Sequence, residues 1–278
     1  MFLKETSDFL YLFKCLIYSS IGICIVILIV FVGEGMPVGR FFFYGAHPIP
    51  VSMVAANAIM LTLILYTQKQ VKLTTFALSV IAGLGVIIIS SSKGPLLGLV
   101  ITIVLFAPII FSNLKVFITT VSLFLITQIY LSSYEQYNAF IVRLLNTSAD
   151  QSTSIRLNIY NEASNAFSNN PIIGEGVGFF SDYYPHNVVL EFLSEGGLLL
   201  GSFLIVFLVW LVWTFFRSFN SIRNPLFVCG IALTILSFCV LMVSFTYTDL
   251  KFLYLGVGVS LQFLTLYEKS KSDYKNSL

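Results

Sequence analysis

Charged residues are scarce in this sequence of 278 residues, of which only 10% are charged and 57% are hydrophobic. Soluble globular chains carry about 25% charged residues, so a soluble fold is excluded. The mean hydropathy is +0.92, and several apolar runs reach the roughly 20 residues that cross about 30 Å of hydrocarbon. The sequence therefore predicts an integral membrane protein that crosses the bilayer several times.

Histidine and cysteine are also rare. The two histidines are His47 and His186, and the four cysteines lie inside apolar runs without C-x-x-C or Cys/His spacing. Cysteines in such runs behave as small hydrophobic residues. We therefore expect no disulfide, no metal site and no cofactor. The net charge is only +2 and no basic run interrupts the chain, which argues against nucleic acid as a partner.

Eight apolar segments predict an all-α, polytopic bundle of transmembrane helices. They lie near residues 13–33, 51–67, 73–91, 94–111, 115–132, 187–216, 225–247 and 251–267. The first segment is too long for a signal peptide and lacks a small-x-small cleavage site, so we expect it to remain as a helix. No repeat or low-complexity tract divides the chain, which we interpret as one membrane domain over 1–278.

The distribution of Lys and Arg predicts the orientation. With a cytoplasmic N-terminus, ten of the fifteen basic residues lie inside, and the five outside are Arg40, Lys93, Arg143, Arg156 and Lys251. Cytoplasmic loops carry an excess of Lys and Arg. We therefore predict that both termini are cytoplasmic, with residues 268–278 as a cytoplasmic tail.

The external loop near 133–186 is much longer than the usual connection of about 4–6 residues. Apolar residues recur in it at helical spacing, including Ile155, Ile159 and Ala163. This pattern predicts one or two short helices on the membrane surface, which together form an ordered outer cap.

The segment 187–216 would measure about 45 Å as a continuous helix, which exceeds a bilayer core of about 30 Å. We expect its outer end to project, with Gly196 and Gly197 near the lipid boundary. Glu191 and Glu195 lie one turn apart on the same face of that end. They are either part of a binding site or solvated acids that the helix dipole favours at a helix start.

The densest polar motifs surround this helix start. They are S-I-R-L-N-I-Y-N-E-A (154–163), N-P-I-I-G-E-G-V-G-F-F (170–180) and P-H-N-V-V-L-E-F-L-S-E-G-G (185–197), preceded by G-R-F-F-F-Y-G-A-H-P (39–48) and S-S-K-G-P-L-L-G (91–98). Over about residues 36–216 this pattern resembles the O-antigen ligase and O-antigen polymerase superfamily. Its members are membrane glycosyltransferases that use lipid-linked glycans.

The resemblance implies a site at the outer face of the membrane. It implies His186 and Arg156 as catalytic residues, and Arg40, Lys93, Asn187, Glu191 and Glu195 as residues that bind the diphosphate or the glycan. It also implies an undecaprenyl-diphosphate-linked donor, a glycan or lipid-A-type acceptor and other glycan-assembly membrane proteins as partners. Lys93 stands where Arg is commoner in the family, which keeps the charge but loses the bidentate geometry.

Elementary chemistry favours the same residues. Cations just outside the bilayer bind a lipid diphosphate by charge-assisted hydrogen bonds. His186 follows Pro185, and an imidazole with an ordinary pKa of about 6.5 can accept a proton from a sugar hydroxyl. Such a reaction needs no metal. The alternative is that each outer cation is solvated or paired with an acid, and we favour that interpretation for Arg143 and Lys251.

Two other functional classes remain open. A secondary transporter places ionisable groups near the midplane of broken helices and often has inverted repeats, and neither feature is evident in the predicted spans. A non-catalytic or truncated member of the same fold is the other alternative, because eight spans are fewer than the ten or more that are typical of the family. Polymerases and ligases differ in their acceptor.

Overall fold

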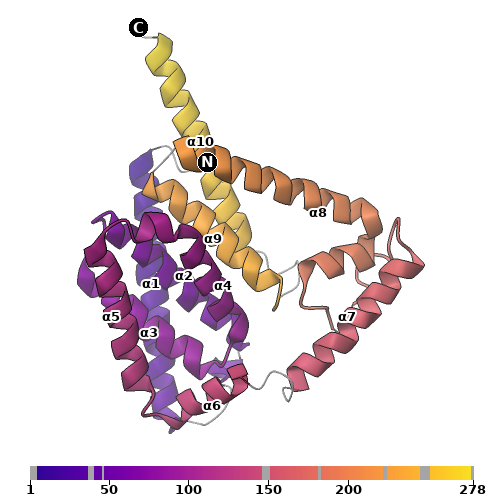
Figure 1. Ribbon diagram of the computed structural model, residues 1–278, viewed down its shortest axis with the longest axis horizontal. Coiled ribbons are helices and arrows are strands. Elements are labelled where there is room, and N and C mark those ends of the chain that lie inside the picture. Colours follow the sequence, from indigo (N-terminus) through magenta and orange to yellow (C-terminus); the bar gives the residue numbers. More distant parts are fainter. Residues whose placement is uncertain are drawn as a thin grey trace.

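The computed structural model describes residues 5–36, 41–45, 47–145, 151–180, 183–221, 224–244 and 251–276, which contain helices and no strand (Figure 1). The elements are α1 (Thr6–Gly33), η1 (Phe43–Gly45), α2 (Pro48–Thr67), α3 (Leu73–Ile89), α4 (Lys93–Ile110), α5 (Leu114–Leu131), α6 (Glu135–Leu145), α7 (Gln151–Asn169), α8 (Val188–Ser221), α9 (Pro225–Leu241) and α10 (Lys251–Asn276). The expected all-α fold is confirmed. The outer loop contains α6 and α7, as its helical spacing predicted.

The helices have the dimensions of a polytopic membrane protein. By length and composition, α1, α2, α4, α5 and α8 can cross a membrane, and α3 and α9 are shorter apolar helices. The eighth apolar segment forms the first part of α10, which continues to Asn276.

The centre of the bundle is α2, which packs against α1, α3, α4 and α9. Its apolar span is 78% buried, as expected for a helix that is hydrophobic on all sides. The hydroxyls of Ser52 and Thr62 in α2 are satisfied locally, since they donate to the carbonyls of Pro48 and Ala58 at 2.9 and 2.7 Å. Because α3, α4 and α9 all pack against α2, they are held near one another.

Small residues join α9 to α10. A Cβ added at Gly256 would lie 2.6 Å from the Thr234 hydroxyl and 2.7 Å from the Thr234 backbone nitrogen. Membrane helices approach closely where glycine leaves room for the neighbouring backbone. This contact fixes α9, whose end contributes to the site described below.

The sixth apolar segment differs from the expected straight helix. At Gly197 the φ and ψ angles are 58° and −155°, and Figure 1 shows α8 changing direction near its start, beside α7. Glycine tolerates a positive φ because it has no Cβ. The segment is therefore not one continuous helix: its first part turns at Gly197 and packs against α7.

Candidate functional site

The glycine-rich turn after α7 pairs with the break in α8. Four backbone hydrogen bonds of 2.8–3.1 Å join them, from the N–H groups of Glu175 to Ser194, Gly176 to Glu195, Leu198 to Pro171 and Leu199 to Ile172. A broken helix exposes backbone groups that lipid cannot satisfy, so these groups need partners within the protein. The turn supplies the partners and fixes the direction of the first part of α8.

Two glycines make this pairing sterically feasible. Gly174 has a φ of 68°, and a Cβ added to it would overlap the backbone at Glu195. A Cβ added to Gly197 would overlap the backbone at Ile172. The sequence analysis did not predict that this turn docks into the E-G-G break.

Glu191 and Glu195 lie in the first part of α8, one turn apart. Each is only 3% exposed, so neither is a solvated acid at a helix start. The Glu195 carboxylate accepts a hydrogen bond from the Phe180 backbone N–H at 3.4 Å. Buried carboxylates require hydrogen-bonding or charged partners. Both acids therefore lie in the interior of the protein.

His186 directly precedes this part of α8 and has a left-handed backbone conformation, with a φ of 53°. Its Nδ1 lies 3.2 Å from the backbone carbonyl oxygen of Ser244. Because a carbonyl can only accept, Nδ1 carries the hydrogen in this bond, and Nε2 is the nitrogen that can take up a proton. A non-glycine residue with this φ is strained, and such strain is concentrated at functional sites.

Arg156 reaches the neighbouring carbonyl from α7. Its guanidinium donates to the backbone oxygen of Val243 at 2.9 Å. Since consecutive Cα atoms are about 3.8 Å apart, Arg156 and His186 converge on one short segment after α9, Val243–Ser244, which we call the α9 end segment. The sequence motifs that contain these two residues are 30 positions apart, and the fold brings them together.

Lys93 is the first residue of α4, and its neighbour Gly94 packs against the same segment. The next residue, Gly94, packs so closely that an added Cβ would overlap the Ser244 hydroxyl and lie 3.2 Å from a Val243 methyl. Lys93 is half-buried. The S-S-K-G motif is thus adjacent to the α9 end segment, beside the Arg156 and His186 contacts.

The turn before Lys93 consists of three buried serines, Ser90, Ser91 and Ser92. Ser91 has a φ of 48°, and the hydroxyls of Ser90 and Ser52 are hydrogen-bonded. The left-handed conformation of Ser91 and the hydrogen bond of Ser90 to α2 fix this turn, and so fix the direction in which α4 starts.

Arg40 lies outside the described residues. The following residue, Phe41, donates its N–H to the carbonyl of Ile89 at 3.1 Å, which places it at the end of α3. Phe41, the last residue of the G-R-F motif, therefore lies next to Ile89, the residue just before the serine turn.

The remaining sequence candidates have local roles. Asn187 caps α8, since its side-chain oxygen accepts from the N–H groups of Val189 and Leu190 at 3.1 and 3.2 Å. Arg143 lies in the last turn of α6, and Lys251 is exposed at the start of α10. Within the described ranges, no group of three His, Cys, Asp or Glu residues is arranged to hold a metal.

The sequence analysis missed the α9 end segment. It contributes backbone carbonyls, which have no residue signature, and it lay inside a predicted apolar span. The polar Ser244 in that span was the available signal, because a serine only 2% exposed needs a structural explanation.

One comparison with known proteins identifies a family for part of this chain. A family model described as O-antigen ligase matches residues 77–205, a region that holds the S-S-K-G turn, both cap helices, the glycine-rich turn and the break in α8. The family resemblance stated from the motifs is therefore confirmed for this region. No curated protein and no solved structure matches the chain significantly.

Proposed function

From the O-antigen ligase region at residues 77–205, we propose that this membrane protein transfers a glycan from an undecaprenyl-diphosphate-linked donor to an acceptor sugar hydroxyl. The observation that carries the proposal is the convergence of Arg156 and His186 on adjacent carbonyls, beside Lys93. Arg156 and Lys93 can stabilise the departing diphosphate, and His186 can accept the proton of the attacking hydroxyl.

Arg156 and Lys93 serve the departing diphosphate. A guanidinium has five N–H donors, and in the part of the chain that the structure describes Val243 accepts from one nitrogen of Arg156. That bond fixes the orientation of the plane, and the other donors bind phosphate oxygens. Preorganised donors of this kind stabilise the negative charge that develops as the bond to the diphosphate breaks.

His186 serves the acceptor. The acceptor oxygen attacks the anomeric carbon, the bond from that carbon to the diphosphate oxygen breaks, and the electron pair stays on the diphosphate. The hydroxyl proton passes to Nε2, because Nδ1 is held by Ser244. Glu191 and Glu195, which are buried in the first part of α8, and Asn187, which caps it, are the further candidates for binding the glycan. Arg40 is a further candidate for binding the diphosphate, because the residue after it, Phe41, is hydrogen-bonded to Ile89 beside the serine turn.

The site is assigned to the outer face of a bacterial inner membrane. The excess of Lys and Arg on the side of the termini supports this orientation. In Figure 1, α10 ends toward the top of the view and α6 lies at the bottom, as expected if the cap and the C-terminus are on opposite sides. A cysteine at Ser168, which is exposed in α7, should react with an impermeant thiol reagent in intact spheroplasts, whereas one at Asn276 should not. Labelling at residue 276 alone would reverse the assignment.

Transfer is tested in proteoliposomes that contain the purified chain and a lipid-linked oligosaccharide. Loss of the donor and appearance of longer chains indicates a polymerase, and transfer to a lipid-A-type acceptor indicates a ligase. The break in α8 is a feature that secondary transporters share. Flux of a solute without any transfer would favour that class, and donor binding without turnover would favour a non-catalytic member. Co-purification with other glycan-assembly proteins would identify partners.

A further inference from the structure

Apolar side chains are exposed where the turn after α7 meets the break in α8. Ile172 and Ile173 in the turn are 69% and 68% exposed, and Leu198 and Leu199 in α8 are 54% and 59% exposed. We call these four residues the turn patch. In Figure 1 the end of α7 and the break in α8 lie at the right of the view, away from α1–α5. Contiguous exposed apolar side chains mark a surface that a partner or a membrane covers.

The membrane helix that follows the break fixes the depth of the turn patch. Residues 198–216 carry no charged side chain, and as a helix they measure about 28 Å at 1.5 Å per residue. The hydrocarbon core of a bilayer is about 30 Å thick. This helix therefore spans the core only if Leu198 and Leu199 lie at the boundary of the hydrocarbon on the side of α7.

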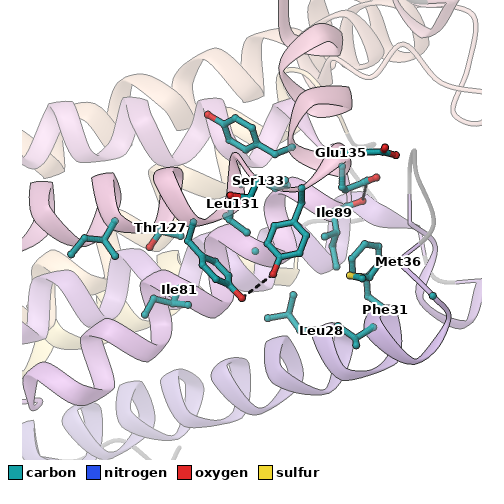
Figure 2. Close-up of a pocket in the computed structure, with 18 residues that line it drawn as sticks. Leu28, Phe31, Met36, Ile81, Ile89, Thr127, Leu131, Ser133 and Glu135 are labelled. Carbon is teal, nitrogen blue, oxygen red and sulfur yellow. Dashed lines mark hydrogen bonds between the residues drawn. The ribbon is translucent and has the colours of Figure 1, made fainter.

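A second helix that faces lipid gives the same thickness. The apolar window of α5 is only 11% buried, and the 18 residues of α5 measure about 27 Å. Figure 2 shows Glu135, just beyond the end of α5, at the margin of a mostly apolar cavity of about 640 Å³ and away from Ile81 and Thr127. Polar residues thus follow α5 after nearly the same apolar length as in α8.

Backbone pairing holds the turn at this boundary. The N–H groups of Leu198 and Leu199 donate to the carbonyls of Pro171 and Ile172 at 2.8 and 3.1 Å, so Ile172 lies at the depth of Leu199. These bonds satisfy two carbonyls of the turn, and Pro171 has no N–H that would need an acceptor. An irregular segment can therefore lie at the edge of the hydrocarbon, where unpaired backbone groups are costly.

An acid limits how far the turn enters the membrane. The Glu175 N–H donates to the Ser194 carbonyl at 2.9 Å, on the other side of the break from Leu198. The exposed Glu175 carboxylate accepts from the Asn170 amide at 2.8 Å. Because a charged side chain is costly in hydrocarbon, Glu175 belongs in the headgroup layer, with the apolar side chains of the turn below it.

We propose that the turn after α7 is a membrane anchor, in which the side chains of Ile172 and Ile173 insert into the leaflet beside α8. The partner is the acyl layer of the phospholipids, because the two isoleucines are continuous with the lipid-facing Leu198 and Leu199. Since the turn also pairs with Glu195, insertion holds the first part of α8 at a fixed height relative to the hydrocarbon. This inference does not depend on the reaction proposed above.

Nitroxide spin labels measure the depth of the turn in nanodiscs of phosphatidylethanolamine and phosphatidylglycerol. In the full-length chain, the exposed native thiol Cys15 is replaced by serine, and labels are attached to Ile173→Cys, Leu199→Cys or Ser164→Cys. Leu199 is the reference in lipid, and Ser164, exposed on α7, is the control in water. We expect the labels at 173 and 199 to collide more with oxygen than with a nickel chelate, and the label at 164 to show the reverse. The label at 173 should lie about 5–10 Å below the headgroups.

A charge on the turn tests whether these side chains hold it in the membrane. Ile172→Asp should withdraw the turn, because a carboxylate is costly in hydrocarbon, so the oxygen-to-nickel ratio at 173 should fall to that of the label at 164. Ser168→Asp places the same charge on the exposed surface of α7 and should leave the ratio unchanged. The label at 199 should remain in lipid in both variants, which shows that α8 is intact.

Three results would overturn the inference. A label at 173 that collides more with the nickel chelate, while the label at 199 remains in lipid, would place the turn in water. A label at 173 that is shielded from both reagents would show that a second copy or another protein covers the turn patch. An unchanged ratio at 173 in Ile172→Asp would show that the isoleucines do not hold the turn in the membrane.

Discussion

Gly94→Ala perturbs the candidate site without altering any residue that would touch the substrate. The added Cβ would overlap the Ser244 hydroxyl and lie 3.1 Å from the Ser244 Cβ and 3.2 Å from a Val243 methyl. Carbon atoms at optimal separation are about 3.5–4.0 Å apart. The α9 end segment must therefore move by roughly 0.5 Å or more to make room, after rotation of the hydroxyl.

This displacement of the α9 end segment should lower the rate of glycan transfer. Both carbonyls of the α9 end segment hold side chains of the site, Arg156 at 2.9 Å and His186 at 3.2 Å, so both side chains move with it. Misplacement by about 1 Å can lower a rate by 10²-fold, and we expect glycan transfer to fall by about 10- to 100-fold. Overpacking of this size also lowers the free energy of unfolding by about 1–3 kcal/mol.

Gly98→Ala is the matched control. Gly98 lies one turn further along α4, where an added Cβ would be 3.2 Å from the Leu236 carbonyl and from a Val240 methyl. It strains the same pair of helices but does not touch the α9 end segment. We expect a similar or smaller decrease in melting temperature and transfer within about threefold of wild type.

A double variant separates the proposed cause from general destabilisation. Adding Ser244→Gly to Gly94→Ala removes both the overlapping oxygen and the Ser244 Cβ, which lies 3.1 Å from the added Cβ, and keeps both backbone carbonyls. Much of the lost transfer should therefore return. Transfer is measured as loss of the lipid-linked donor, with membrane abundance determined in parallel. Wild-type transfer by Gly94→Ala, or no recovery in the double variant, would refute the positioning role of the α9 end segment.

Other substitutions test the separate parts of the site. Arg156→Lys should fold but lose most transfer, because an ammonium cannot reproduce bidentate phosphate contacts, and His186→Ala should abolish transfer at normal membrane abundance. Arg143→Ala, measured in the same assay, should change little; near-normal transfer by both site variants would show that the chemistry lies elsewhere. Gly197→Ala should lower the free energy of unfolding by about 1–3 kcal/mol, since its Cβ would overlap Ile172. Unchanged resistance to proteolysis in the turn after α7 would contradict that prediction.

The helices could be predicted because their determinants are local in sequence. The beginnings of α2 and α9 coincide with Pro48 and Pro225, and proline is favoured in the first turn of a helix. α1 begins earlier than expected, at Thr6, where Glu5 and Asp8 form a capping box. The first residues of that extension, Thr6, Ser7 and Asp8, are polar, and a prediction based on apolar length alone could not include them.

The break in α8 could not be predicted from apolar length. Residues 187–216 form a mostly apolar run with three glycines, and glycines occur in intact membrane helices as well. The break depends on the turn after α7, whose backbone replaces the lost helical hydrogen bonds. A pairing between segments about 25 positions apart leaves its trace only in glycines at both ends, Gly174 and Gly197, each of which lacks a Cβ where the other segment passes.

The same reasoning explains why the α9 end segment had no signature of its own while Gly94 did. Val243 and Ser244 act through carbonyl oxygens, which every residue type provides, so their side chains are constrained only by volume. Gly94 packs directly against these two side chains. Within the S-S-K-G motif, the lysine therefore supplies a positive charge. The glycine leaves room for a segment that lies 150 positions further along the chain. A chain with a larger residue at 94 would need a smaller residue at 244 to keep Arg156 and His186 in place.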